Sequence, residues 1–142
     1  MNCRVIQKPF NNLLAKRAKM FFKRKKPKNK ISELIMDYAG DFILEGEDEF
    51  EKQQRLNTAV SAWNFACFDE IEQDNLIKKY LKEYKKLNPE YNKKDLQEIK
   101  IVLKRLIKLK IKIYPNFKVQ VFNAQLVEKN GKAYVTVASM DI

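Results

Sequence analysis

The first apolar pattern in the body of the chain has helical spacing. Apolar residues recur three or four positions apart across residues 32–45, which places them on one face of an α-helix. The residues on this face are Ile31, Leu34, Ile35, Tyr38, Phe42 and Ile43. We predict that Ser32 caps the start of the helix and that Gly46 ends it.

A second helix is predicted over residues 48–68. Its C-terminal half, LNTAVSAWNFACF, is apolar on nearly all sides, which is typical of a buried central helix. Trp63 is expected in the core, and Cys67 is expected to be a small buried residue without catalytic activation.

Two further helices are predicted, at residues 70–87 and 94–114. Acidic residues at the start of the first and lysines toward its end suit the helix dipole. The sequence NPEYN, residues 88–92, is a turn between them. The segment IKLKIKI, residues 107–113, alternates like a strand, but helix is favoured because the helical pattern continues without a breaker until Pro115.

The chain ends in a predicted β-hairpin, residues 117–140. Asn130-Gly131 separates two runs rich in β-branched residues, and this dipeptide favours a type I′ turn. A two-residue loop pairs Leu126 with Val135 and Ala124 with Val137. The predicted core face consists of Phe122, Ala124, Leu126, Val135 and Val137. An isolated hairpin is marginal, so this one must pack on the helices or gain a third strand.

These patterns predict an α+β fold: about four helices, then a C-terminal antiparallel hairpin. Residues 31–142 are expected to form one domain. Residues 1–30 are expected to form a basic N-terminal arm that is either partly helical or disordered, with Pro27 ending any helix.

Charge divides the chain into three blocks. Residues 1–30 hold eleven Lys or Arg and no acid, residues 31–74 hold two basic and twelve acidic residues, and residues 75–142 hold sixteen basic and six acidic residues. The net charge is +11 and the pI is about 9.6. This balance indicates an anionic partner such as nucleic acid, although lysine-rich composition alone is an alternative explanation.

Missing residue types exclude several mechanisms. The chain has no histidine, which excludes Ser-His-Asp and Cys-His catalysis and His-ligated zinc. Its three glycines cannot build a P-loop or a GxGxxG turn, and its two cysteines cannot supply a four-thiolate zinc site. We therefore expect a non-enzymatic protein without a cofactor or a structural metal.

Polar residues on the first two predicted helices leave alternatives open. Three carboxylates recur every four residues: Glu33, Asp37 and Asp41. They could hold Mg²⁺, but a solvated polar stripe is the favoured interpretation. Three polar residues interrupt the second helix: Asn57, Ser61 and Asn64. They either line a pocket or satisfy nearby backbone groups.

Two basic features are candidate nucleic-acid contacts. The first comprises nine residues of the arm: Lys16, Arg17, Lys19, Lys23, Arg24, Lys25, Lys26, Lys28 and Lys30. Phe21 and Phe22 among them could stack on unpaired bases. The second, here called the lysine ridge, comprises Lys100, Lys104, Lys108 and Lys112. Spacing by four places the ridge along one helix face over about 18 Å.

Four functional hypotheses follow for the basic segments. Binding of RNA or single strands is favoured slightly, through sequence-independent phosphate contacts. The alternative is a protein-interaction module whose acidic helices, residues 31–74, bind a basic partner segment or the arm itself, in one chain or in a homo-oligomer. An anionic membrane surface is less favoured, and no membrane span is expected. An enzyme is the least favoured.

The expected location is a reducing intracellular compartment, because Cys3 and Cys67 form no disulfide framework. The sequence KRKKPK resembles a nuclear-localisation segment, which has meaning only in or delivered to a eukaryotic cell.

Overall fold

The computed structural model describes residues 31–141 as four helices followed by a two-stranded antiparallel sheet. The elements are α2 (Ile31–Leu44), α3 (Glu49–Phe65), α4 (Glu70–Leu87), α5 (Lys93–Ile113), β1 (Val119–Lys129) and β2 (Lys132–Asp141). The predicted α+β class is confirmed, and residues 107–113 are helical. The predicted arm lies outside the described residues. No helix within residues 31–141 is long and apolar enough to cross a membrane.

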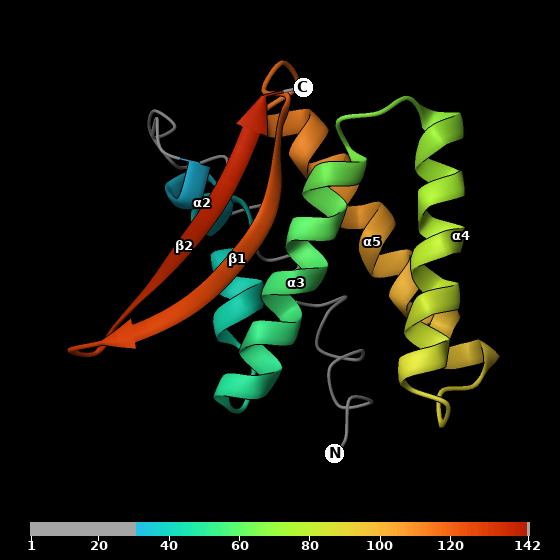
Figure 1. The fold of residues 1–142 in the computed structure, drawn as a ribbon, viewed down its shortest axis with the longest axis horizontal. Helices are drawn as coiled ribbons and strands as arrows, with labels where there is room; N and C mark the ends of the chain where they lie inside the picture. The colour runs from blue at the N-terminus through green and yellow to red at the C-terminus, as the bar shows by residue number, and fades with distance from the viewer. Residues whose placement is uncertain (1–30, 142) are drawn as a thin grey trace.

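Helix α3 lies at the centre of the described fold, as predicted (Figure 1). It packs against β1 on one side and against α2 and α5 on others. Trp63 is fully buried, and its ring contacts Tyr38 edge-on with the ring centroids 5.4 Å apart. The Trp63 indole N–H also donates to the Val119 carbonyl at 2.8 Å. The predicted core tryptophan therefore joins the helices to the sheet.

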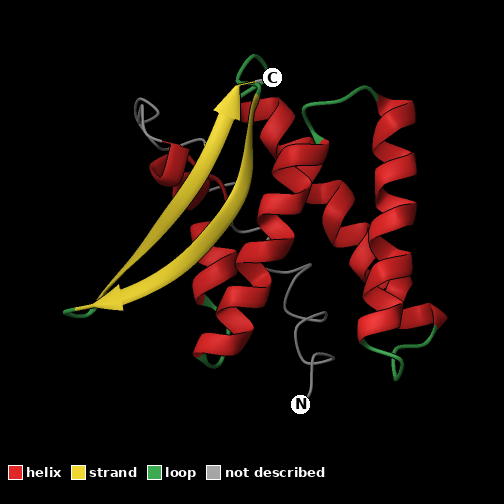
Figure 2. Ribbon diagram, in the orientation of Figure 1, coloured by secondary structure: helices red, strands yellow, loops and turns green. Residues whose placement is uncertain are grey.

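Helix α4 is peripheral (Figure 2). Ile77 is the one buried residue of this helix. Several of its other contacts are aromatic: Tyr80 meets Phe65 at 6.0 Å between ring centroids, and Tyr84 meets Tyr91 at 5.3 Å. Because so little of α4 is buried, most of its surface is available to a partner.

Most helix ends follow local capping rules. Asp48, Asp69 and Asn92 are N-caps, and Asn92 forms a capping box with Asp95. The prediction for Ser32 was wrong, because Ser32 is itself helical within α2.

The second helix is shorter than its predicted bounds of 48–68. It ends at Phe65, and Ala66 is its C-cap. Residues 67 and 68 form a tight turn in which the Cys67 N–H donates to the Asn64 carbonyl at 3.1 Å. Asp69 must adopt an extended backbone to cap α4, so the helical geometry cannot continue through it.

The hairpin has the predicted turn and register. Asn130 and Gly131 both have positive φ, 53° and 76°, as a type I′ turn requires. Leu126 pairs with Val135, and Ala124 pairs with Val137.

One residue of the predicted core face is misplaced. The register shifts between Val121 and Asn123, so a β-bulge interrupts the alternation of side chains. Phe122 is 59% exposed, whereas Val121 is buried. Phe122 is therefore not on the core face, contrary to the prediction.

Polar side chains of α3 bind the edge of β1 that β2 leaves free. Asn64 donates to the Val121 carbonyl and accepts from the Val121 N–H, both at 2.8 Å. Gln53 donates to the Ala124 carbonyl at 2.9 Å and accepts from the Leu126 N–H at 3.0 Å. These amides replace a third strand along β1. Of the two alternatives left open for Asn64, hydrogen bonding to nearby backbone groups is therefore confirmed.

Two glycines give a matched stability prediction. A Cβ added at Gly46 would lie 2.8 Å from the Lys52 backbone nitrogen, whereas a Cβ at Gly40, inside α2, would meet Met36 Cε at 3.5 Å. We expect Gly46→Ala to lower the free energy of unfolding by about 1–3 kcal/mol through overpacking. Gly40→Ala should raise it by up to about 1 kcal/mol through helix propensity. Urea unfolding of both variants measures this, and equal effects would contradict the close approach at Gly46.

Candidate nucleic-acid interface

The lysine ridge lies on the solvent side of α5. Lys104, Lys108 and Lys112 are exposed, and Lys100 is half-buried. The opposite side of the helix packs into the core through Ile99, Leu103 and Leu106. The helical spacing that predicted the ridge therefore gives a row of ammonium groups facing solvent.

Acidic neighbours neutralise the ridge only in part. Lys104 pairs with Asp74 of α4 at 3.7 Å, and both side chains are about half exposed, 49% and 54%. Such exposed pairs contribute little and are screened by salt. Lys100 and Lys108 form no ion pair with an acid of residues 31–141. The ridge therefore keeps unpaired positive charge.

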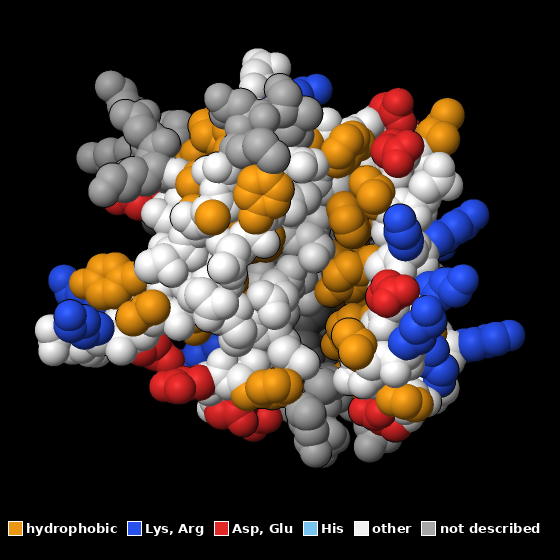
Figure 3. Space-filling view, viewed as in Figure 1, with side chains coloured by type: hydrophobic (Ala, Val, Ile, Leu, Met, Phe, Trp, Pro, Cys, Tyr) orange, Lys and Arg blue, Asp and Glu red, His pale blue; other side chains and the backbone are white. Residues whose placement is uncertain are grey.

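A second set of lysines covers α4. From the sequence, these lysines were interpreted only as charges that suit the helix dipole. The members of this set are Lys78, Lys79, Lys82, Lys85 and Lys86, all exposed. Figure 3 shows basic side chains gathered over this helix. The spacing of Lys78, Lys82 and Lys86 by four residues was the signal that could have identified a second ridge.

These lysines differ in their partners. Lys86 pairs with Glu83 at 3.6 Å on an exposed surface. The Lys85 ammonium donates to the carbonyls of Pro89, at 2.7 Å, and Tyr91. Within the described part of the chain, Lys78, Lys79 and Lys82 form no ion pair. Three lysines of α4 are therefore free to meet an anion.

The N-terminal half of α4 limits where a polyanion could lie. An open groove of about 430 Å³ separates it from the C-terminal half of α5. It is lined by the buried residues Ile77 and Ile107 and by the exposed Ile111, and its charged rim mixes acids of α4 with Lys104 and Lys108. The acids of this rim repel phosphate, so the favourable surface extends toward the C-terminal half of α4.

Lys110 is a lysine of α5 that cannot contribute to the surface. It is 1% exposed, its ammonium donates to the Tyr114 carbonyl at 3.0 Å and to that of Phe117, and it lies 5.0 Å from the Trp63 ring centroid. Burial lowers the pKa of this ammonium. Lys110 therefore joins the end of α5 to the following loop, and its role is structural.

Cys67 is buried, as predicted. Burial raises the pKa of the Cys67 thiol, and the positive charge of Lys110 opposes this only in part. A thiol held in its protonated form is a poor nucleophile.

The carboxylates considered for Mg²⁺ do not converge. Across residues 31–141, no three acidic or cysteine side chains come close enough together to hold a metal ion. Glu33 is exposed, whereas Asp37 and Asp41 are half-buried on α2.

The acidic surface gathers around the loop between α2 and α3. Glu45, Glu47, Asp48 and Glu49 are exposed there, and Figure 3 shows acidic side chains at this end of the molecule. The two basic residues of the acidic block do not neutralise it. Lys52 pairs with Glu128 at 3.3 Å, and Arg55 is buried with Glu51.

The predicted arm contacts lie outside the described residues. They are Lys16, Arg17, Lys19, Lys23, Arg24, Lys25, Lys26, Lys28 and Lys30. Their contribution remains a prediction.

Comparison of the chain with protein-family models, curated sequences and solved structures finds no match. Function must therefore be inferred from the surface chemistry of this α+β fold alone.

Proposed function

We propose that this protein binds single-stranded nucleic acid, such as RNA, without catalysing a reaction. The contact surface comprises the lysine ridge of α5 and the exposed lysines of α4, with residues 1–30 adding further phosphate contacts. One observation carries the proposal: five exposed or half-buried lysines of this contact surface form neither an ion pair nor a hydrogen bond with another side chain or carbonyl of residues 31–141. They are Lys78, Lys79, Lys82, Lys100 and Lys108.

Lysine chemistry determines what kind of binding this surface would give. Ammonium groups act as point charges toward phosphate and carry no base information. Affinity should therefore depend strongly on salt and weakly on sequence. The sequence contains no helix-turn-helix or zinc-finger pattern for reading a duplex groove, which favours single strands. We include a reducing intracellular location in this proposal.

The test is the salt dependence of binding to a labelled single-stranded RNA. In the full chain, we expect Lys78→Gln/Lys82→Gln/Lys108→Gln to reduce the slope of log affinity against log salt by about 1 for each lysine that contacts phosphate. Fluorescence anisotropy between about 50 and 200 mM salt measures this slope.

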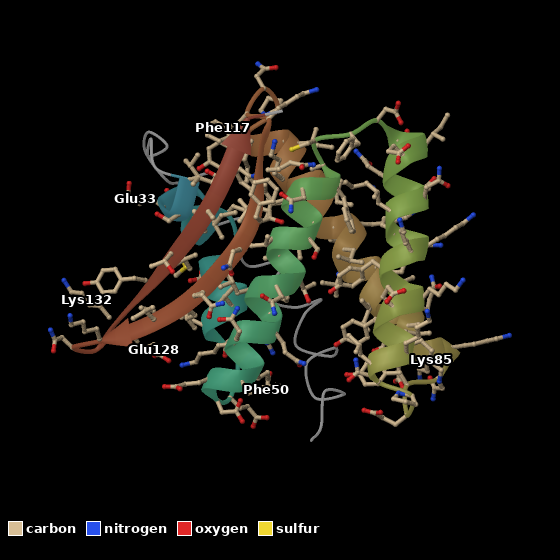
Figure 4. The ribbon with its side chains drawn as sticks, viewed as in Figure 1. Glu33, Phe50, Lys85, Phe117, Glu128 and Lys132 are labelled. Carbon is tan, nitrogen blue, oxygen red and sulfur yellow. The ribbon has the colours of Figure 1, made fainter. Side chains whose placement is uncertain are left out.

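The matched control removes three exposed lysines elsewhere: Lys118→Gln/Lys129→Gln/Lys132→Gln. Lys132 lies at the hairpin turn, away from α4 (Figure 4). We expect this variant to change the slope by less than about 1. Equal slopes for the two triple variants would show a general effect of net charge, and no binding at the lowest salt would refute the proposal.

A protein partner is the second candidate. The unneutralised acids between α2 and α3 favour it, because a basic segment would find Glu45, Glu47 and Glu49 exposed there. The basic segment is either part of another protein or the arm of this chain. Failure of nucleic-acid binding would leave this function as the better proposal.

A further inference from the structure

A second site is suggested by an open groove of about 490 Å³ between α3 and β1. None of its lining residues is charged. The lining residues with polar side chains are Gln53, Asn57, Ser61, Asn64, Asn123 and Gln125. Figure 3 shows that the surface over α3 and β1 is largely uncharged, in contrast to α4. We call this site the amide groove.

An exposed aromatic ring borders the amide groove. Phe122 is among its lining residues and is 59% exposed. The β-bulge between Val121 and Asn123 displaces Phe122 from the core face. Bulges commonly redirect a side chain beside a functional site. A large apolar ring held at the rim of a polar groove offers a flat surface for stacking.

Some polar groups of the groove are already used by the fold. Gln53 and Asn64 bind the backbone of β1 through both ends of their amides. These two residues build the groove and have little capacity left for a ligand.

Three other amides retain hydrogen-bonding groups. The side-chain carbonyl of Asn57 accepts from the Gln53 side chain at 2.9 Å, which leaves the Asn57 side-chain NH₂ group available. The side-chain carbonyl of Asn123 accepts from the Gln125 NH₂ group at 3.3 Å. The Asn123 NH₂ group and the side-chain carbonyl of Gln125 therefore remain available. Within the described residues these groups make no other hydrogen bond. Two NH₂ groups and one carbonyl oxygen are therefore available among the residues that line the groove with Phe122.

We propose that the amide groove binds one unpaired nucleobase, stacked on Phe122 and hydrogen-bonded by Asn57, Asn123 and Gln125. A nucleobase is flat, uncharged and edged with both donors and acceptors, so it matches each property of the groove. Phosphate does not, because no cation lines the site. Stacking on aromatic rings and amide contacts to base edges are how proteins recognise single strands.

This inference goes beyond the proposed function, because the lysines of α4 and α5 contact phosphate only. The base has two possible sources, a single-stranded nucleic acid or a free nucleoside, and the experiment separates them.

The first experiment compares a base-bearing single-stranded oligonucleotide with an abasic strand of equal length and charge. The full chain should bind the base-bearing strand roughly tenfold more tightly, the size expected for one stacked base. Phe122→Ala should abolish this preference without changing the salt dependence. Phe50→Ala is the matched control, because Phe50 is 52% exposed and lies at the start of α3, outside the groove (Figure 4). It should keep the full preference.

The second experiment titrates the full chain with adenosine and with cytidine and follows the side-chain NH₂ resonances of asparagine and glutamine by NMR. Shifts of Asn57 and Asn123 that Phe122→Ala removes would support the site for a free nucleoside, even if no oligonucleotide binds. Base preference in the oligonucleotide without nucleoside shifts would support a site for a base within a strand.

Two results together would overturn the proposal: equal affinity for base-bearing and abasic strands, and no nucleoside-dependent shift in the groove. The salt-dependent binding by lysine would then stand or fall separately. A preference that Phe122→Ala and Phe50→Ala reduce equally would also overturn it, because the base would not be stacking in the groove.

Discussion

Replacing Arg55 with methionine is expected to lower the free energy of unfolding by about 3–5 kcal/mol. Arg55 is 1% exposed, and its guanidinium donates to Glu51 at 3.1 Å and to the Phe42 carbonyl at 2.8 Å. It also lies 5.3 Å from the Phe42 ring centroid. Burial lowers the pKa of Arg55 and Glu51 opposes this only in part, so the ion pair offsets part of the loss of hydration.

The cost of Arg55→Met comes mainly from the groups left behind. Glu51, 8% exposed, would keep a buried carboxylate without its cation, and the Phe42 carbonyl would lose its donor. Urea unfolding gives the free energy. Adding Glu51→Leu should recover part of the loss, because removing both charges is less costly than leaving one unpaired.

An exposed ion pair provides the control for Arg55. Lys86→Met removes the contact with Glu83 and should cost less than about 0.5 kcal/mol. Two results would contradict this prediction. In the first, Arg55→Met lowers the free energy of unfolding no more than Lys86→Met does. In the second, the losses from Arg55→Met and Glu51→Leu add in the double variant, and the buried pair then does not stabilise the junction of α2 with α3.

The second large effect is expected for Asn64→Leu, which should lower the free energy of unfolding by about 3 kcal/mol. The substitution removes two hydrogen bonds to Val121, a residue that is 2% exposed. A buried backbone N–H and a buried carbonyl would then be unsatisfied, and each costs about 1–3 kcal/mol.

Asn75→Leu makes the same chemical change at an exposed position of α4 and should stay within about 0.5 kcal/mol of the wild type. Hydrogen exchange of the Val121 amide adds a local measurement. Slow exchange of that amide in Asn64→Leu would contradict a role for Asn64 in holding β1.

These two residues mark the limits of sequence reasoning for the core. Asn64 interrupts an apolar helix, and the sequence left open whether it lines a pocket or bonds to backbone. It does both, because Val121 lies beside it in the fold. From the sequence, Arg55 was only one of two basic residues in the acidic block, and nothing predicted that it is buried. Its burial depends on the Phe42 carbonyl, which lies on another helix.

The candidate nucleic-acid surface was also predicted only in part from the sequence. Helical spacing placed the lysine ridge correctly on the outside of α5, because the opposite face carries the apolar residues. The lysines of α4 were overlooked as a surface, although the little burial of that helix leaves them exposed. Charge counting also included Lys110, which is buried beneath Trp63.

The sequence by itself determined the α+β class, the order of the elements, most helix ends and the hairpin register. These features depend on residues close together in the chain: apolar spacing, capping side chains and the Asn130-Gly131 turn. Tertiary structure alone decided the position of Phe122. Val121 and Ala124 both face inward, held by Asn64 and Gln53 of α3. Their spacing of three residues is incompatible with strict alternation, so a bulge must displace the two residues between them, Phe122 and Asn123.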